Sequence, residues 1–248
     1  MTALAVTACN VDISTDAEAR DQWTRSYTLE KGGAFEVRNT NGRIRIETTD
    51  GNAVEVSAER VVRAGTDEAA KTALASFAIA ETVAPDRILL DSTGSSGMAV
   101  RVQRQVHYTI RLPRWANVTI KETNGDLEIS GLSGTFRAEA TNGRIQARAL
   151  ENSAAVETTN GDVSLEFAKL GPDGVTCETT NGRIRITVPR DAKASLSARV
   201  TNGVIHTDNL TVTASEQSRR RLEGTIGGGE GPTLRLSTTN GEISVSGK

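Results

Sequence analysis

The chain has 248 residues, enough for one elongated domain or two compact ones. Its 29 basic and 31 acidic residues leave a net charge of −2, which indicates neither a nucleic acid nor an anionic membrane surface as a partner. Aromatic residues make up 3% of the chain, which is low for a sandwich core or for a surface that stacks on sugars or bases. A narrow core of small and β-branched residues, as in a β-solenoid, suits this composition.

The first residues contain Val-Thr-Ala-Cys9, an order typical of the end of a bacterial lipoprotein signal: an aliphatic residue, two small residues and the cysteine that receives the lipid. No positive segment precedes it, and the apolar run is shorter than the roughly 7–15 residues of a signal sequence. A start codon further upstream would explain both. We expect residues 1–20 to be a signal remnant and tether with Cys9 as the lipid attachment site. An unlipidated, disordered terminus is the alternative.

Residues 21–117 are predicted to form the irregular N-terminal part of a β-solenoid domain over residues 21–248. Thr66 is a helix N-cap residue followed by two acids, so a helix should begin there and end near residue 76. It should cover an end of the sheet with Ala70, Leu74 and Phe77. Longer strands are expected at residues 77–83, 87–91 and 100–112. The last of them has an alternating apolar face made of Val102, Val106, Tyr108, Ile110 and Leu112.

The tripeptide Thr-Asn-Gly occurs seven times and organises the rest of the chain. Successive asparagines are separated by 83, 18, 18, 21, 21 and 38 residues, and the last gap is twice 19. A single period near 19 therefore fits the chain from Asn124 onward, which indicates stacked repeats that bury their apolar side against their neighbours. The predicted corner residues are Asn41, Gly42, Asn124, Gly125, Asn142, Gly143, Asn160, Gly161, Asn181, Gly182, Asn202, Gly203, Asn240 and Gly241.

Apolar and polar residues alternate on both sides of each Asn-Gly pair, which predicts a strand, a corner and a second strand with one buried face. The buried face changes parity across the pair, so the corner must hold an extra residue. Asn and Gly tolerate the positive φ that such a corner needs. Two architectures fit this pattern. One is a meander of hairpins, for which Asn-Gly is a strong turn signal, and the other is a parallel β-solenoid with one repeat per coil.

Charges two places after the asparagine favour the solenoid. Asp126, Arg144, Asp162 and Arg183 alternate in sign along successive repeats. If the coils stack at the strand spacing of about 4.8 Å, these side chains form a ladder of opposite charges, whereas in a meander they lie about two strands apart. We therefore predict an all-β, single-stranded parallel solenoid, with an irregular end, one short helix and regular coils over residues 118–248.

No residue pattern indicates a metal, a cofactor or catalysis. The only histidines, His107 and His206, are 99 residues apart, without clustered carboxylates or cysteines beside them. Cys177 falls on a buried strand position and is interpreted as a small apolar residue. Residues 215–221, which include three adjacent arginines, are interpreted as a polar loop rather than a nucleic-acid contact. No phosphate-binding loop and no nucleophile motif occurs in the sequence.

Several motifs, in their order along the chain, resemble the DUF4097 group of proteins, whose adhesin name rests on architecture. They are the run Tyr108-Thr-Ile-Arg-Leu-Pro113, the Thr-Asn-Gly corners, and Gly224-Thr-Ile-Gly-Gly-Gly229 followed by Leu234-Arg-Leu-Ser-Thr-Thr-Asn-Gly241. The resemblance covers roughly residues 25–248. It implies a right-handed, β-helix-like solenoid in bacterial envelope proteins that are often membrane-anchored or exported, and it carries over no catalytic residue.

These observations favour a non-enzymatic protein of the bacterial cell envelope, lipid-anchored or exported, that presents an adhesin-like binding or scaffold surface to an envelope glycan or protein. A structural or oligomeric module and an accessory of envelope-stress signalling are the alternatives. A polysaccharide-active enzyme is a further hypothesis, with Asp126 and Asp162 as carboxylates and Arg144 between them. It is less favoured, because pairing within the charge ladder explains this trio without a ligand.

Overall fold

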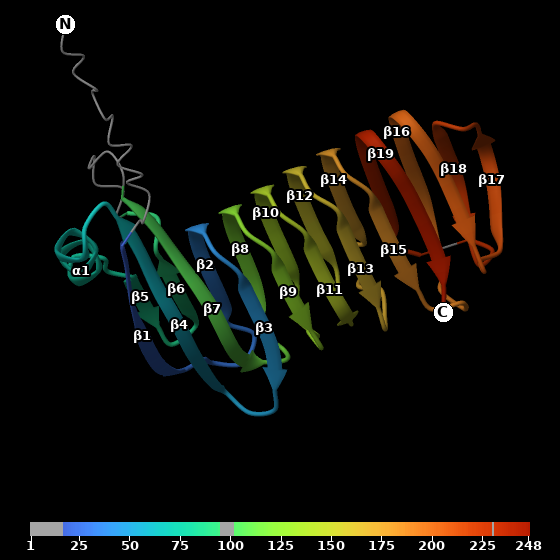
Figure 1. Ribbon diagram of the computed structural model, residues 1–248. Coiled ribbons are helices and arrows are strands. Elements are labelled where there is room, and N and C mark those ends of the chain that lie inside the picture. Colours follow the sequence, from blue (N-terminus) through green and yellow to red (C-terminus); the bar gives the residue numbers. More distant parts are fainter. Residues whose placement is uncertain (1–16, 95–101, 230) are drawn as a thin grey trace, which may run out of the picture.

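A computed structural model describes residues 17–94, 102–229 and 231–248 of the chain. Figure 1 shows an elongated stack of strands in which successive units lie side by side along one axis. Apart from one helix, α1 (Asp67–Ala75), the regular elements of the described residues are strands, so this part of the chain is all-β as predicted. The predicted lipid attachment site, Cys9, lies outside the described residues.

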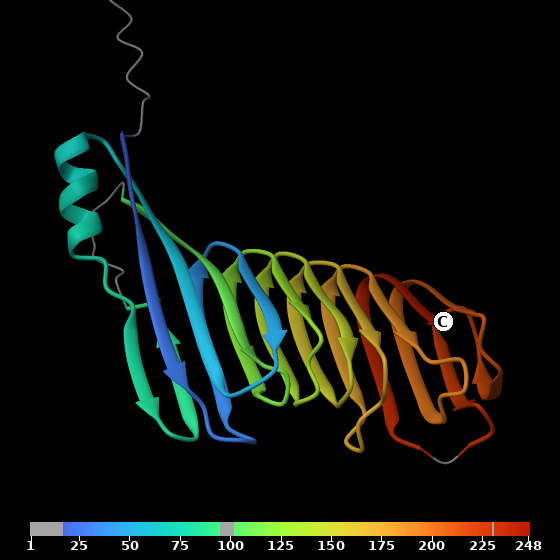
Figure 2. The same cartoon turned by 90° about the horizontal axis from the view of Figure 1, so that it is seen from below.

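Seven strand–corner–strand units, here called coils, make up the stack, and each contains one Thr-Asn-Gly tripeptide. In five coils the two strands are separate: β2 (Ala34–Asn41) and β3 (Ile44–Thr49), β8 (Asn117–Asn124) and β9 (Leu127–Ser130), β10 (Phe136–Asn142) and β11 (Ile145–Leu150), β12 (Ala154–Asn160) and β13 (Val163–Phe167), β14 (Val175–Asn181) and β15 (Ile184–Val188). In two coils one long strand runs through the corner: β16 (Ala194–Asp208) and β19 (Thr233–Gly247). The strands before the corners form a pre-corner row and those after the corners form a post-corner row (Figure 2).

Each strand of a regular coil pairs with the equivalent strand of the neighbouring coil. β10 pairs in parallel with β8 and β12, and β11 pairs in parallel with β9 and β13. The register places Asn142 directly between Asn124 and Asn160. Equivalent residues of successive repeats are therefore one strand spacing apart, which excludes the hairpin meander for these coils.

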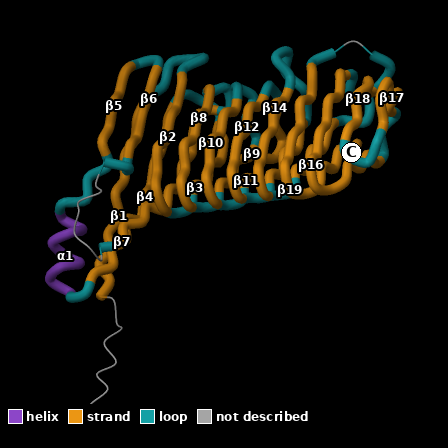
Figure 3. The backbone as a smooth tube through the Cα atoms, turned by 90° about the horizontal axis from the view of Figure 1, so that it is seen from above, coloured by secondary structure: helices purple, strands orange, loops and turns teal. Residues whose placement is uncertain are grey.

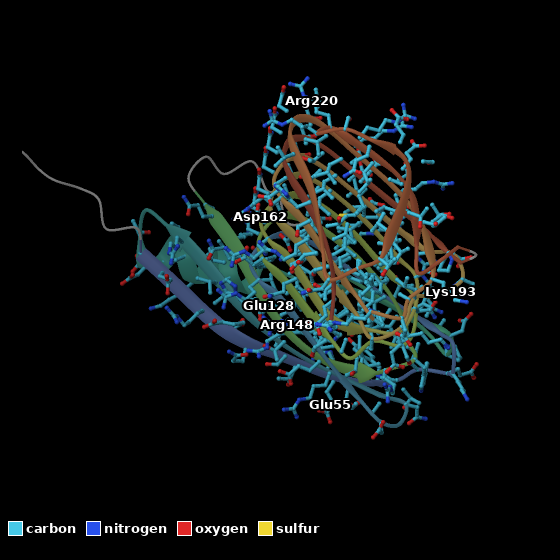
Figure 4. All side chains as sticks on the ribbon, turned by 90° about the vertical axis from the view of Figure 1, so that its right-hand side faces the viewer. Glu55, Glu128, Arg148, Asp162, Lys193 and Arg220 are labelled. Carbon is cyan, nitrogen blue, oxygen red and sulfur yellow. The ribbon has the colours of Figure 1, made fainter. Side chains whose placement is uncertain are left out.

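The side chains that point between the two rows are almost all apolar. Val163 and Leu165 of one coil and the equivalent Ile184 and Ile186 of the next are at most 1% exposed. Figure 4, which looks along the stack, shows side chains filling the space between the rows. The alternation of buried and exposed positions follows the apolar alternation of the sequence, because successive residues of a strand point to opposite faces.

The N-terminal part widens the stack with five strands: β1 (Ala17–Thr28), β4 (Ala53–Ala64), β5 (Ala80–Ala84), β6 (Arg87–Asp91) and β7 (Gln103–Pro113). β7 pairs in parallel with β3 and antiparallel with β4, and β4 pairs antiparallel with β1, which extends the post-corner row. β6 pairs in parallel with β2 and antiparallel with β5, which extends the pre-corner row. The helix α1 packs against β1 and β4 at this end of the stack (Figure 3).

The predicted helix is confirmed, and the first strand begins within the predicted tether. Thr66 caps α1 by accepting a hydrogen bond from the backbone N–H of Ala69 at 3.2 Å, and Ala70 and Leu74 are buried. β1 begins at Ala17 and pairs along its whole length with β4. Residues 17–20 therefore belong to the sheet, although the sequence indicated that the tether reaches residue 20. The long partner strand β4 explains the difference, because it offers hydrogen-bonding groups as far as Ala64.

The order of the coils along the stack differs from their order along the chain. β19 pairs in parallel with β14 and β15 on one side and with β16 on the other, so the last coil of the sequence lies between the two that precede it. The residues between Asn202 and Asn240 form no further coil. They contain β17 (Val212–Gln217) and β18 (Arg221–Ile226), an antiparallel hairpin that pairs with β16. The predicted loop at residues 215–221 is therefore wrong except at residues 218–220.

The inward-pointing residues of β16 and β19 explain why β19 lies between β15 and β16. Ile243 and Val245 of β19 are fully buried, whereas the equivalent Ile205 and Thr207 of β16 are half-buried and exposed. A coil with neighbours on both sides gains most from apolar inward residues. β16, whose second half is more polar, lies at the end of the post-corner row. There it has, among the described strands, a paired strand on one side only.

Candidate functional site

The seven corner asparagines form a continuous column along the stack. Six of the seven amide Nδ2 groups donate to Oδ1 of the asparagine in a neighbouring coil, in hydrogen bonds of 2.7–2.9 Å. The order is Asn41, Asn124, Asn142, Asn160, Asn181, Asn240 and Asn202. At the N-terminal end, Asn41 Nδ2 donates to the backbone carbonyl of Arg104 at 3.2 Å. These asparagines therefore add a side-chain hydrogen bond to every interface between coils.

The corner glycines let the backbones of neighbouring coils approach closely. A Cβ at Gly143 would lie 2.1 Å from the carbonyl oxygen of Gly125, and one at Gly161 would lie 1.8 Å from that of Gly143. Gly143 has a φ of 134°, but Gly161 is not among the positive-φ residues. The expectation that every corner needs a positive φ is therefore wrong. The shared requirement is space, because a side chain would overlap the next backbone.

The four predicted charge-ladder residues lie in one column, each directly before a post-corner strand. Asp126 Oδ1 accepts a hydrogen bond from the backbone N–H of Arg144, and Asp162 Oδ1 accepts one from that of Arg183, both at 2.9 Å. The Arg183 guanidinium also contacts Asp162 Oδ2 at 2.8 and 3.1 Å. Partial burial raises the pKa of Asp162, but the hydrogen bonds and charge of Arg183 outweigh this and lower that pKa below its usual value. Each aspartate thus binds the corner of the next coil.

The column is longer than the sequence indicated. Arg43, directly before β3, lies next to Asp126 in this column. Glu242 of β19 lies next to Arg183, because β19 pairs with β15. The signs therefore alternate over six coils. His107 Nδ1 accepts a hydrogen bond from the backbone N–H of Arg43 at 3.1 Å and so takes the place of an aspartate. The sequence did not indicate that Arg43 belongs to the column, because it lies 83 residues before Asp126 in the chain.

The residues two places before the corner asparagines form a second column. Their side chains point inward, and Thr158, Thr179 and Thr238 of this column are buried. Thr179 and Thr238 of this column donate through Oγ1 to a glycine carbonyl of the neighbouring coil, at 3.4 and 3.1 Å. Toward the N-terminal end the same column holds Ala140, Glu122 and Asn39 instead. None of these three residues was among those predicted from the sequence. The available signal was the change away from threonine at a fixed repeat position.

Glu122 and Asn39 form a buried polar cluster with Ser92. The exposed fractions of these residues are 5%, 2% and 5%. Glu122 Oε2 accepts from Asn39 Nδ2 at 2.9 Å, Glu122 Oε1 accepts from the backbone N–H of Asn124 at 3.2 Å, and Ser92 Oγ donates to Asn39 Oδ1 at 2.8 Å. Burial raises the pKa of Glu122 to about 7, and the hydrogen bonds offset only part of this. The carboxyl therefore changes its protonation near neutral pH.

Two hollows flank this cluster, each with a volume of about 360 Å³. The first, called the Arg104 groove, lies between β7 and the corner of the first coil. Its lining includes Asn39, Asn41, Phe77, Ser92, Arg104 and Gln105. The second, called the Glu122 groove, lies over the pre-corner strands β8, β10 and β12 and carries both signs of charge. Its lining includes Arg38, Lys121, Glu122, Glu139, Ala140 and Glu157.

The two histidines, Cys177 and Arg220 lie outside the linings of the two grooves. His107 lies near the N-terminal end, and His206 lies at the other end, with its Nε2 3.9 Å from Glu242 Oε1. Cys177 is fully buried in the core, and burial raises the pKa of its thiol, in agreement with its interpretation as a small apolar residue. Arg220 projects from the far end of the stack, as labelled in Figure 4.

The structure places Asp126 and Asp162 two coils apart, with Arg144 in the coil between them. Asp162 already binds Arg183. Over residues 17–94, 102–229 and 231–248, no group of three or more His, Cys, Asp and Glu side chains is arranged to hold a metal ion. Within the same ranges no helix has the length and apolar character needed to cross a bilayer.

Comparison with known proteins places the chain in a family. A family model described as "Toastrack DUF4097" matches residues 1–246. A crystal structure of "a putative cell adhesion protein" from Clostridium sporogenes ATCC 15579 is similar with a TM-score of 0.49 and 13% identity, over 92% of this chain and 100% of that chain. One of "a putative adhesin" from Bacteroides fragilis NCTC 9343 is similar with a TM-score of 0.44 and 14% identity, over 91% and 97%. No curated protein matches significantly. Because the family model spans nearly the whole sequence, the chain belongs to the Toastrack DUF4097 family.

Proposed function

We propose that the protein is a non-enzymatic binding or scaffold protein of the bacterial cell envelope, with an adhesin-like role. The observation that carries this proposal is the regular outer surface of the coils. On it, asparagines and alternating charges recur from coil to coil in register, at one strand spacing of about 4.8 Å. Such a surface offers an extended glycan or protein several equivalent contacts in a row.

The proposal includes the location and the sense of coiling. The motif Val-Thr-Ala-Cys9 supports attachment to a membrane through a lipid, and export without a lipid is the alternative. A right-handed sense of coiling is proposed because connections between parallel strands of one sheet are right-handed in about 98% of cases. No cofactor and no nucleic acid is part of the proposed role.

Metabolic labelling with palmitate tests the location. The gene is expressed with its natural upstream region, as wild type and as Cys9→Ser, and label and fractionation are compared. We expect label on the wild-type protein only, together with recovery in the envelope fraction. An unlabelled wild-type protein that is recovered with the soluble fraction of the cell would refute the location.

Co-sedimentation tests the binding role. Purified full-length chain is mixed with isolated envelopes, either untreated, treated with protease or treated with periodate. Saturable sedimentation that only one treatment removes is the expected result, and the treatment that removes it identifies a protein or a glycan partner. A chain that never sediments with envelopes would contradict the proposed function.

A structural module is the second candidate, and the end of the stack favours it. β17 pairs with β18, and among the described strands no other strand pairs with it, so one edge of β17 is open. Open edges pair readily with other strands, including those of a second copy. Light scattering over a range of concentrations tests this candidate, since end-to-end stacking would make the mass rise with concentration. A constant monomer mass would exclude it.

A further inference from the structure

β7 carries a charge at a position where its pattern demands an apolar residue. Val106, Tyr108, Ile110 and Leu112 alternate along this strand and are at most 1% exposed. Arg104 belongs to the same alternation, and its Nε is buried without a hydrogen-bond partner among the described residues. A buried guanidinium atom without an acceptor destabilises a fold. A residue of this kind beside a groove is therefore a candidate for ligand binding.

The Arg104 groove exists because β7 continues past the first corner. From Tyr108 onward β7 pairs with β3, whereas residues 103–107 extend beyond the point where the first coil turns. Asn41 Nδ2 donates to the Arg104 carbonyl and Asn39 Nδ2 to the Val106 carbonyl, both at 3.2 Å. The N–H of a strand residue faces the same side as its carbonyl, so the N–H groups of Arg104 and Val106 also face the corner. This side of β7 therefore presents backbone donors as well as the side chain.

Arg104 is the only charged residue in the described lining of this groove. The other polar groups are neutral amides and hydroxyls, such as those of Asn41, Gln103 and Gln105. The Arg104 guanidinium lies 6.0 Å from the centre of the Phe77 ring, and Arg60 holds the Phe77 carbonyl by a hydrogen bond. The volume of about 360 Å³ falls within the range of small-molecule sites. Phe77 itself is only 2% exposed. The groove thus combines one positive charge with several neutral hydrogen-bonding groups.

We infer that the Arg104 groove binds the carboxylate of an acidic saccharide, such as a hexuronate residue. A guanidinium binds a carboxylate through two parallel hydrogen bonds. The neutral amides and hydroxyls suit the hydroxyls of a sugar ring. A phosphate or sulfate group favours several cationic groups, and this lining has one. The inference deepens the proposed binding role and rests on it.

Calorimetric titration of the full-length chain tests this inference. The probes are glucuronate, galacturonate and N-acetylneuraminate, with glucose and galactose as neutral counterparts and acetate as a bare carboxylate. We expect saturable binding of at least one acidic sugar, weakened by salt and absent for the neutral sugars. Arg104→Gln removes the charge and should weaken this binding about 10- to 100-fold.

Arg111→Gln is the matched control, because Arg111 lies on the exposed face of the same strand, outside the groove. It should bind the acidic sugar like the wild type, and melting curves check that both variants fold. Absence of saturable binding of every acidic sugar would overturn the inference. Equal binding by the wild type and Arg104→Gln would do the same, as would acetate binding as tightly as the acidic sugars.

Envelope co-sedimentation separates this inference from the proposed function. A wild-type chain that sediments with envelopes but binds no acidic sugar would retain the envelope role and refute the role of the groove. A chain that binds acidic sugars through Arg104 but never sediments with envelopes would refute the envelope role. Loss of both activities in Arg104→Gln, with both retained in Arg111→Gln, would support the two proposals together.

Discussion

The regular coils from β8 to β15 and the N-terminal part from β1 to β7 continue the same two rows by different means. In the regular coils a corner side chain binds the same residue type in the next coil, as Asn160 binds Asn142. In the N-terminal part antiparallel strands and α1 extend the rows, and the repeat positions hold other residues. Asn39 replaces a threonine inside the corner, and His107 binds the corner of the next coil as an aspartate does elsewhere.

This difference shows where specific chemistry is expected in a repeat protein. In the regular coils a polar group is satisfied by its equivalent next door, so a charge such as Asp162 has a structural explanation. Where the repetition stops, that explanation is missing. Glu122 replaces the corner threonine in the first regular coil, and Arg104 lies on β7 before this strand pairs with the first coil. The Glu122 side chain is buried, and so is the Nε of Arg104. A departure from the repeat pattern is thus a better indicator of a small-molecule site than the density of charge, whereas the repeating surface suits an extended partner.

A corner glycine is the place where the regular coils should break most severely. In Gly161→Val the new Cβ would lie 1.8 Å from the Gly143 carbonyl oxygen, a backbone atom that both coils hold in place. We expect the free energy of unfolding in urea to fall by at least about 3 kcal/mol. Asn160→Ala in addition removes two hydrogen bonds of the asparagine column and should lower it further. Gly65→Val is the control, since a Cβ there meets nothing within 4 Å; an equal loss would contradict the packing argument.

The order of the coils can be tested with two isoleucines at the same repeat position. Ile243 of β19 is fully buried between neighbouring coils, whereas Ile205 of β16 is half-buried. Ile243→Ala should therefore lower the free energy of unfolding by about 2–5 kcal/mol, and Ile205→Ala by less than about 1 kcal/mol. The measurement is urea unfolding at one temperature. A larger loss in Ile205→Ala than in Ile243→Ala would indicate that the coils follow chain order, and equal losses would contradict the difference in burial.

The Glu122 cluster should make stability depend on pH in the opposite direction from a paired carboxylate. The pKa of Glu122 is about 7 in the folded chain, against an ordinary value of 4.5. Between these values the unfolded chain has already lost the proton that the folded chain keeps, so stability falls as pH rises from about 4.5 to 7. The loss is on the order of 3 kcal/mol.

Glu122→Gln should remove this loss, because the amide stays neutral at every pH. The test compares the free energy of unfolding of wild type and variant at several pH values, and only the difference counts, since other carboxyls also titrate. Glu157→Gln is the control, an exposed residue of the next coil but one. A difference between wild type and Glu122→Gln that stays constant from pH 4.5 to 7 would show that the cluster does not hold a proton as described.

The smallest effect is expected from the charge ladder. Arg183→Gln removes the contacts of an exposed guanidinium with Asp162 but leaves the backbone hydrogen bond of residue 183. The loss should be below about 1 kcal/mol and should shrink further at high salt. Arg185→Gln, at an exposed position of the same strand, is the control. A loss of several kcal/mol would mean that the ladder, and not the corners, holds the coils together.

Most of the fold could be predicted because its signals are local. The alternation around each Asn-Gly pair predicted two strands with one buried face, and Thr66 predicted the start of α1. The candidate site could not be predicted in the same way. The Arg104 groove joins β7 to a corner more than 60 residues earlier in the chain, through the contact of Asn41 with Arg104. The burial of Glu122 likewise depends on Asn39, 83 residues away.

By itself the amino-acid sequence determined the repeat, the strand positions, the corners and the alternating charges, because periodicity and residue type decide how neighbouring residues point and turn. Only the tertiary structure decided that β19 lies between β15 and β16, that residues 212–226 form a hairpin, and that Arg104 lies beside a groove. These features depend on which surfaces meet between segments far apart in the chain. Burial of apolar area decides that choice, and it belongs to pairs of segments, not to any one of them.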